Sequence, residues 1–202
     1  MSEPLTLDAL EAAVRARFPQ LATDVKYGEL TVHATADTLL DLLTHCRDDE
    51  ALSLRLLADL SGVHWPAGDH AIPRQPATTG WPVYRVARDH GVIEVLYVLR
   101  SLQRNHRLRI SVGTPDTDPV LPSATGVFPT AEFHEREVFD MFGVRFEGHP
   151  NLTRILMPDE WIGHPQRKDY PLGGVDTPYE HDQFIPPPDR RDLRDVVGGD
   201  VQ

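Results

Sequence analysis

The sequence predicts an α+β protein in which a mixed or antiparallel sheet packs against helices and an extended, proline-rich C-terminal arm follows. Three observations lead to this prediction. Two segments near the N-terminus repeat apolar residues at helical spacing, three later segments have strand patterns, and nine of the 18 prolines lie in the last 76 residues. We therefore expect a globular domain over residues 1–147 and a partner-binding arm over residues 148–202.

The first half of the chain shows helix and strand patterns in turn. Residues 6–18, TLDALEAAVRARF, gather apolar side chains at helical spacing, with Thr6 as the N-terminal cap and Pro19 after the last turn. Residues 27–35, YGELTVHAT, alternate apolar and polar side chains and predict a strand. Asp37 is expected to open a second helix over the following TLLDLLTHC.

Three further segments are rich in β-branched and aromatic residues and predict strands. They are WPVYRVARD at 81–89, GVIEVLYVLRS at 91–101 and RLRISVGT at 107–114. The dipeptide Asp89-His90 and the following Gly91 are expected to form a tight hairpin turn between the first two.

A third helix is expected between Pro129-Thr130 and Gly143, because proline favours the first turn of a helix and glycine favours its C-terminal cap. At 100° per residue, Ala131, Val138, Phe139 and Phe142 fall on one side of this helix. The polar residues Glu132, Arg136 and Asp140 stack on another side.

Glu135 is the exception on this helix, because it points into the apolar arc. A buried carboxylate is costly unless donors or a cation satisfy it, so Arg145 or Arg154 is the expected partner. The alternative, that Glu135 reaches solvent at the helix edge, stays open.

Composition and charge exclude several classes of function. With 31 acidic and 20 basic residues the net charge is −11, and no basic patch is visible that would bind nucleic acid or anionic lipid. No apolar run approaches the roughly 20 residues of a membrane helix. The N-terminus lacks the pattern of a signal peptide, and Cys46 has no second cysteine to pair with. These features favour the cytoplasm.

Common catalytic and metal-binding motifs do not fit the sequence. His134-Glu135 begins like a metalloprotease motif, but the position that needs a second histidine is Val138. The chain has no glycine-rich loop between a strand and a helix, and one thiol cannot hold an iron–sulfur cluster. Glu135 and Glu137 are two residues apart on a helix and therefore face different directions, so a catalytic carboxylate pair is not expected.

Residues 135–172, EREVFDMFGVRFEGHPNLTRILMPDEWIGHPQRKDYPL, resemble the signature of the C subunit of respiratory complex I, the NADH:quinone oxidoreductase. Upstream, LRLLADLSGVHWP and IEVLYVLRS also resemble that family, so the likeness runs from about residue 52 to residue 185. Two departures concern local packing. His64 stands where the family has Asp, and Phe128 and Phe133 stand where it tends to have Trp.

The resemblance implies a subunit of the peripheral arm of complex I, on the cytoplasmic side of the membrane and membrane-associated only through the complex. It implies no cofactor in this chain, since partner subunits bind the FMN, the iron–sulfur clusters and the quinone that carry electrons from NADH. It further implies packing against the D subunit, close to the B and I subunits. The residues that match the signature, expected to serve partner contacts and packing, are Glu135, Arg136, Glu137, Asp140, His149, Arg154, Arg167, Lys168, Asp169 and Tyr170.

Two other hypotheses stay open at this point. The chain could be the equivalent subunit of a related membrane-bound hydrogenase or dehydrogenase complex, because such subunits share the signature. It could also be a stand-alone soluble enzyme, in which case the purified chain should be coloured or bind a nucleotide.

Overall fold

The computed structural model describes residues 4–73 and 83–171, apart from side chains over 69–87. The described residues up to Tyr170 belong to one compact unit, and the boundary expected after residue 147 falls inside this unit. The part of the expected arm over residues 172–202 lies outside the described residues.

Within the described ranges the helices are α1 (Leu7–Arg17), α2 (Ala36–Asp48) and α3 (Ala131–Phe142). The strands there are β1 (Ala22–Lys26), β2 (Glu29–Ala34), β3 (Leu56–Trp65), β4 (Gly68–Pro73), β5 (Val83–Arg88), β6 (Val92–Ser101), β7 (His106–Pro115), β8 (Val120–Pro122) and β9 (Arg145–Glu147).

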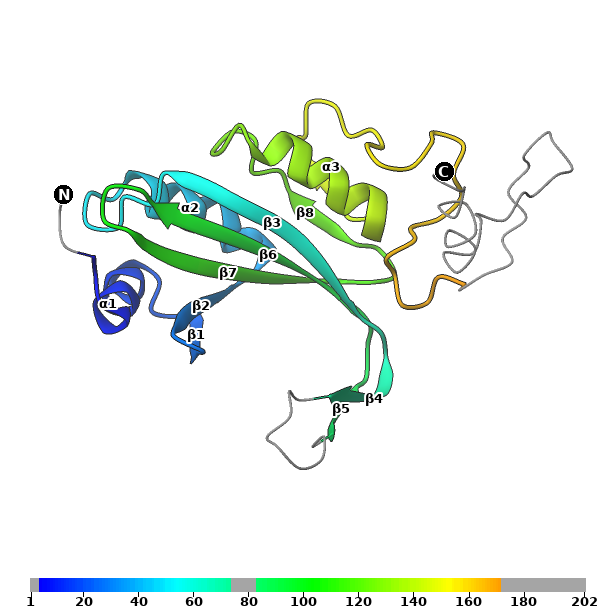
Figure 1. The fold of residues 1–202 in the computed structure, drawn as a ribbon, viewed down its shortest axis with the longest axis horizontal. Coiled ribbons are helices and arrows are strands. Elements are labelled where there is room, and N and C mark those ends of the chain that lie inside the picture. The colour runs from blue at the N-terminus through cyan, green and yellow to red at the C-terminus, as the bar shows by residue number, and fades with distance from the viewer. Residues whose placement is uncertain (1–3, 74–82, 172–202) are drawn as a thin grey trace, which may run out of the picture. The chain divides into compact units, whose positions relative to one another are not determined.

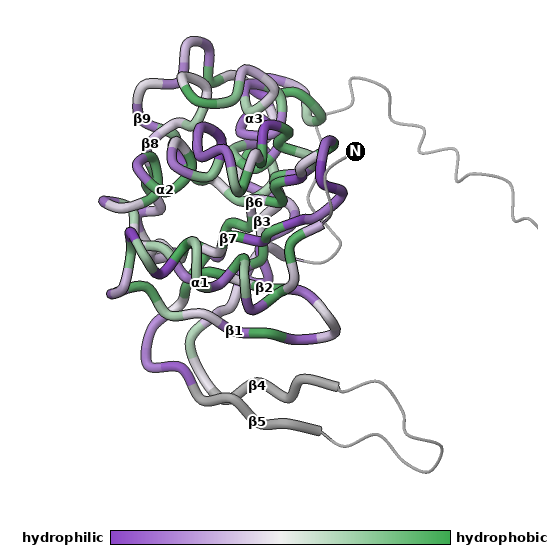
Figure 2. Tube along the Cα trace, turned by 90° about the vertical axis from the view of Figure 1, so that its left-hand side faces the viewer, coloured by the Kyte–Doolittle hydropathy of each residue, from purple (hydrophilic) through white to green (hydrophobic). Residues whose placement is uncertain are grey.

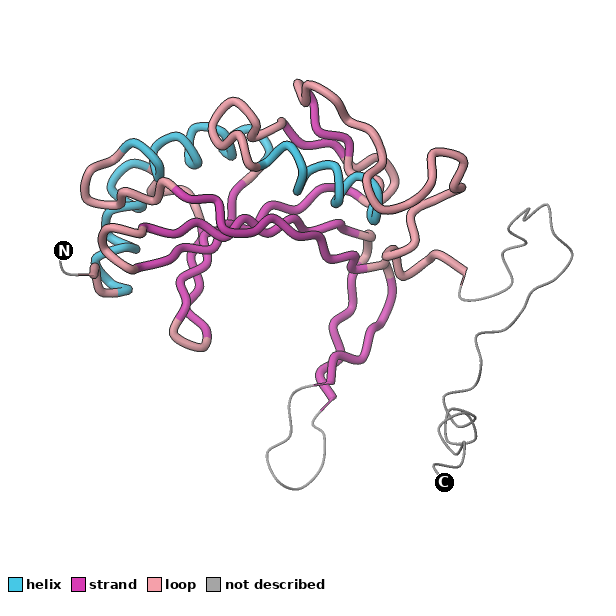
Figure 3. The backbone as a smooth tube through the Cα atoms, turned by 45° about the horizontal axis from the view of Figure 1, so that its top comes forward, coloured by secondary structure: helices cyan, strands magenta, loops and turns pink. Residues whose placement is uncertain are grey.

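The central layer is a five-stranded sheet in the order β1-β2-β7-β6-β3. The pair β2–β7 is parallel and the other pairs are antiparallel, so the sheet is mixed, as the sequence predicts. Helices α2 and α3 lie over the same face of this sheet (Figures 1 and 3). The predicted α+β class is therefore confirmed.

A single apolar core joins the helices to the sheet. Hydrophilic and hydrophobic residues alternate along the three helices, as amphipathic packing requires (Figure 2). Leu39, Leu42 and Leu43 of α2 share one buried cluster with Leu108 and Ile110 of β7. The described helices have 11, 13 and 12 residues, and none of them is long and apolar enough to cross a membrane.

The ends of α1 and α2 follow from local hydrogen bonds. The Thr6 hydroxyl accepts from the Ala9 N–H at 3.2 Å, which confirms Thr6 as the cap of α1. The expectation that Asp37 opens α2 is wrong, because Thr35 is its N-cap. Thr35 and Thr38 form a capping box, in which the Thr35 N–H donates to the Thr38 hydroxyl at 3.1 Å. Asp37 lies in the first turn, where a carboxylate is favourable toward the helix dipole.

The prediction of a hairpin turn at residues 89–91 is wrong. β6 pairs with β3 and β7, whereas β5 pairs with β4 in a separate two-stranded ladder. Gly91 lies against the end of β7, where the Asp116 N–H donates to its carbonyl at 3.1 Å. A Cβ on Gly91 would lie 1.7 Å from the Asp116 carboxylate, so any larger residue would require that carboxylate to shift.

Candidate functional site

Helix α3 carries the start of the signature, and the fold places it directly over β3. Gly62 of β3 makes this possible, because a Cβ there would lie 2.7 Å from the Phe142 ring. The helix ends at Gly143, which has a left-handed φ of 82° and whose N–H bonds to the Phe139 carbonyl. The predicted limits of this helix are confirmed.

Glu135 is completely buried on the sheet side of α3, so the alternative of a solvent-reaching side chain is wrong. Its expected arginine partner is also wrong. The Ser123 hydroxyl donates to Oε2 at 2.7 Å and the Ala124 N–H donates to Oε1 at 2.6 Å. Burial raises the pKa of Glu135 to about 7, against the lowering effect of these two hydrogen bonds. Arg145 instead forms an ion pair with Asp118 at 2.9 Å on the surface.

Asp140 is the carboxylate that receives Arg154. It is also fully buried, and the Arg154 Nη1 approaches its Oδ1 to 2.6 Å. Its second oxygen, Oδ2, accepts three consecutive backbone N–H groups from Ile155, Leu156 and Met157, at 3.1, 2.8 and 2.8 Å. Burial alone would raise the pKa of Asp140, but these hydrogen bonds outweigh it and hold the pKa below its usual value.

The remaining residues of the signature on and after α3 hold the chain that follows the helix. Arg136 donates to the carbonyls of Thr153 and Arg154, at 3.1 and 2.9 Å, and does not pair with Asp140 as a helical stack would suggest. His149 Nε2 is 3.0 Å from the Glu132 carbonyl. Arg154 also donates to two carbonyls further along, those of Trp161 and Gly163. A segment without regular secondary structure is thus fixed through its backbone.

A second cluster joins the end of this segment to the sheet. The Arg167 guanidinium binds Asp169 through two hydrogen bonds, at 3.0 and 2.8 Å, and also donates to the Asp116 carbonyl. The Lys168 N–H donates to Nδ1 of the buried His64 at 2.9 Å. His64 Nε2 lies 3.2 Å from the Asp116 carboxylate. The signature residues Arg167 and Lys168 therefore contact Asp116 and His64, which lie 51 and 104 positions earlier in the chain. Sequence spacing could not reveal these contacts.

The side chains of His64, Asp116 and Asp169 each offer a ligand atom, and these atoms lie within 4.8 Å of one another. Each is already engaged, however. Both ring nitrogens of His64 are hydrogen-bonded, and the Asp169 carboxylate binds the Arg167 guanidinium. A metal ion at this position would have to displace the guanidinium or the Lys168 N–H, so the geometry favours a hydrogen-bonded clasp.

The surface of the signature region carries a few large apolar side chains among charged and polar ones. Leu156 is 60% exposed and Ile162 is 85% exposed, and Phe133, just before the signature, is 59% exposed. Among the signature residues, Glu137, Lys168 and Asp169 are exposed, whereas Tyr170 is half-buried with its hydroxyl donating to the Ile162 carbonyl. The inner polar residues hold the backbone, and the apolar side chains of Leu156 and Ile162 lie on its outer side.

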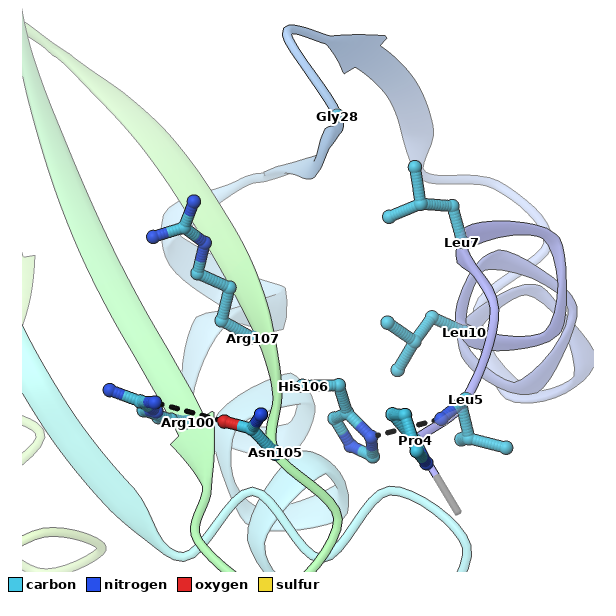
Figure 4. A pocket seen from close by; sticks show the side chains of 9 residues that line it. All are labelled: Pro4, Leu5, Leu7, Leu10, Gly28, Arg100, Asn105, His106 and Arg107. Carbon is cyan, nitrogen blue, oxygen red and sulfur yellow. Dashed lines mark hydrogen bonds between the residues drawn. The ribbon is translucent and has the colours of Figure 1, made fainter.

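Elsewhere in the described chain, a cavity of about 340 Å³ lies between α1 and the β6–β7 hairpin. Figure 4 shows Leu5, Leu7 and Leu10 along one side of it and Arg100 and Arg107 along the other, with His106 between them. His106 is hydrogen-bonded on both sides, to the Leu5 N–H and to the Leu52 carbonyl, so its ring is structural. Burial raises the pKa of the Cys46 thiol to about 12, which makes it a poor nucleophile.

Known proteins are similar to this chain over the signature region and over most of the rest of its sequence. Residues 32–176 match the family described as "Respiratory-chain NADH dehydrogenase, 30 Kd subunit". The chain is 48% identical over 169 residues to the C subunit of the NADH-quinone oxidoreductase of Acidothermus cellulolyticus, covering 84% of this chain and 77% of that protein. It is 44% identical to the corresponding C subunit of a Nocardioides species, covering 91% of this chain and 66% of that protein.

A solved structure resembles the fold. The trypsin-resistant fragment (1–134) of Nqo5 superposes with a TM-score of 0.55 at 28% identity, covering 73% of this chain and 100% of that fragment. The shared sequence therefore accompanies a shared fold. Because the family match spans most of the chain and the identities exceed 40%, this chain belongs to the family of the respiratory-chain NADH dehydrogenase 30 kDa subunit.

Proposed function

We propose that this chain is the C subunit of an NADH:quinone oxidoreductase and that it serves the assembly of the peripheral arm. Curated relatives of the same family are named as C subunits of NADH-quinone oxidoreductases. In this proposal the chain contributes to the electron transfer from NADH to quinone, coupled to proton translocation, as a structural subunit. The equivalent role in a related hydrogenase complex is not favoured by these names.

One structural observation carries the assembly role. The buried Asp140 accepts the N–H groups of residues 155–157, and its partner Arg154 donates to the carbonyls on either side of Ile162. Leu156 and Ile162 are therefore presented to solvent on a backbone that is held by hydrogen bonds. Apolar side chains on a pre-ordered backbone bind a partner with a smaller loss of conformational entropy. Asp140 and Arg154 thus support a contact surface in this proposal.

The partners in this proposal are the D, B and I subunits of complex I, with the D subunit as the direct neighbour. FMN, iron–sulfur clusters and quinone belong to partner subunits, and the chain reaches the cytoplasmic face of the membrane only through the complex. The arm over residues 148–202 is proposed to add contacts, with Arg167 and Tyr170 among the residues that position it.

Native mass spectrometry of the particle that contains this chain tests the proposal. The tagged chain, expressed in the organism that encodes it, should be recovered in a particle with the D, B and I subunits. This particle should oxidise NADH and reduce quinone. The same chain expressed alone should be colourless and should not oxidise NADH. Recovery of the chain only as a free protein, or NADH oxidation by the chain alone, would overturn the assembly role.

A further inference from the structure

Glu135 is buried with neutral partners on both carboxylate oxygens. Ser123 and Ala124 supply a hydroxyl and a backbone N–H, and no basic side chain among those that the structure describes pairs with it. The other buried acid of α3, Asp140, has an arginine and three N–H groups. A buried carboxylate without a cation is far more costly to ionise than one with a cation. The surroundings of Glu135 therefore favour the neutral acid more than those of Asp140, which favour the carboxylate.

A chain of hydroxyl groups leads from Glu135 toward the surface. The Ser123 hydroxyl contacts both Glu135 and the Thr125 hydroxyl, which is 2.8 Å away, and either hydroxyl can donate in that pair. Ser123 is buried, Thr125 is half-buried, and the next residue, Gly126, is exposed. Hydroxyl groups both donate and accept, so the two hydrogen bonds can reverse together without any movement of heavy atoms.

The two directions of this chain correspond to two states of the acid. When Glu135 is ionised, Thr125 donates to Ser123 and Ser123 donates to the carboxylate. When Glu135 carries a proton, the acid donates to Ser123 and Ser123 donates to Thr125. One proton taken from solvent at Thr125 passes on as the Thr125 proton moves to Ser123 and the Ser123 proton moves to Glu135, and the carboxylate charge falls from −1 to zero.

The titratable group that faces Glu135 from the sheet is Tyr97 of β6. Its hydroxyl is fully buried and has no hydrogen-bond partner among the described residues. Burial, followed by the charge of Glu135, raises the pKa of Tyr97 well above its usual value, so the phenol keeps its proton and does not compete for the one on the acid. The segment over residues 121–125 contains no titratable side chain. On α3, Glu132 is half-buried and Arg136 donates to the carbonyls of Thr153 and Arg154.

We propose that Glu135 is a proton-binding site inside the folded chain, filled from solvent through the hydroxyl groups of Thr125 and Ser123. The site lies at the contact between α3 and the segment that follows β8, so the proton changes the charge of that contact. This inference is independent of the assembly role, because it concerns the chain alone.

Infrared spectroscopy of the full-length chain tests the site. The carbonyl band of a protonated carboxylic acid should appear as the pH is lowered from about pH 9 to about pH 6, above the range in which acids with ordinary pKa values contribute strongly. Glu135→Gln should abolish this band and Asp140→Asn should retain it. Labelling of the glutamates with ¹³C should shift the band in the unmutated chain, which keeps the test valid if either variant fails to fold. A band that is absent, or that does not shift with labelled glutamate, would overturn the site.

The hydroxyl path has its own test. Thr125→Val leaves both direct donors to Glu135 in place, so the titration midpoint should stay the same, while exchange of the acid proton for deuterium should slow by about tenfold or more. Thr125→Ser should restore the rate. An unchanged rate in Thr125→Val would show that the proton enters by another path.

Discussion

At the scale of single residues, α3 shows how the same functional group acquires opposite properties from its surroundings. Glu135 and Asp140 are both inaccessible to solvent. Burial raises the pKa of Glu135 to about 7, because the lowering effect of its two neutral donors is smaller than the effect of burial. Burial opposes ionisation of Asp140 as well, but Arg154 and three N–H groups lower its pKa. Glu135 therefore carries a proton over part of the physiological range, whereas Asp140 is a permanent anchor for the segment after the helix.

Asp140→Asn should destabilise the chain by about 3 kcal/mol or more, because it leaves the Arg154 guanidinium without its counter-ion and removes a charge-assisted acceptor from three N–H groups. Urea unfolding followed by circular dichroism measures this loss. Glu137→Gln is the matched control, since Glu137 is exposed on the same helix and should change the free energy of unfolding by less than about 0.5 kcal/mol. Equal effects of the two substitutions would contradict the anchor.

The raised pKa of Glu135 predicts that stability falls as the pH rises. Its pKa is 4.5 in the reference state and about 7 in the folded chain, so between these values the folded chain holds a proton that the unfolded chain releases. The free energy of unfolding should fall by up to about 3 kcal/mol as the pH rises through this window and change no further above it.

Glu135→Gln should remove this decrease, as measured by urea unfolding at a series of pH values. Asp140 does not contribute in the same window, because its pKa is lowered and its stabilisation is lost only as the pH falls below the usual value of 3.8. Parallel pH profiles for the Gln variant and the unmutated chain would rule out the raised pKa.

At the scale of secondary-structure elements, the sequence pattern predicts helix limits and strand positions, because local interactions determine them. The limits of α3 follow from Pro129-Thr130 and Gly143, the strand at β2 follows from its alternation, and the strands at β6 and β7 follow from their composition. The pairing of β5 was mispredicted, because a strand pattern does not identify its partner. Strand β3 was not predicted, since its ladder has a register shift between Leu57 and Asp59 that breaks the alternation. The partners of Glu135 and Asp140 are set by tertiary packing that no local pattern encodes.

The packing of α3 on β3 depends on the absence of a side chain at Gly62. Gly62→Ala would place a Cβ 2.7 Å from the Phe142 ring, so the helix or the ring must shift. We expect a loss of about 1–3 kcal/mol in the free energy of unfolding. Gly126→Ala is the control, because a Cβ there meets nothing within 4 Å. A wild-type melting curve for Gly62→Ala would show that this close contact is not required.

At the scale of the whole molecule, one compact unit that ends at Tyr170 contains both the sheet and the anchored signature segment. Removal of residues 171–202 should therefore leave the circular dichroism spectrum and the melting temperature of the chain nearly unchanged. Recovery of the complex should decrease if the removed residues add partner contacts. A truncated chain that fails to fold would contradict the limit of the compact unit, and unchanged recovery would contradict the role of the removed residues in binding.

The central claim is that the inner polar residues of the signature hold the backbone that presents Leu156 and Ile162 to partner subunits. The most direct test is the recovery of the D subunit with the tagged chain carrying both Leu156→Asp and Ile162→Asp, relative to a chain carrying Leu102→Asp. Leu102 is 71% exposed in the β6–β7 turn and serves as the control for a charge on an exposed leucine. Because interface energy is concentrated in a few anchors, the double variant should fold normally and lose the D subunit by about tenfold or more, while Leu102→Asp should retain it. Full recovery of the D subunit with a folded double variant would contradict the claim.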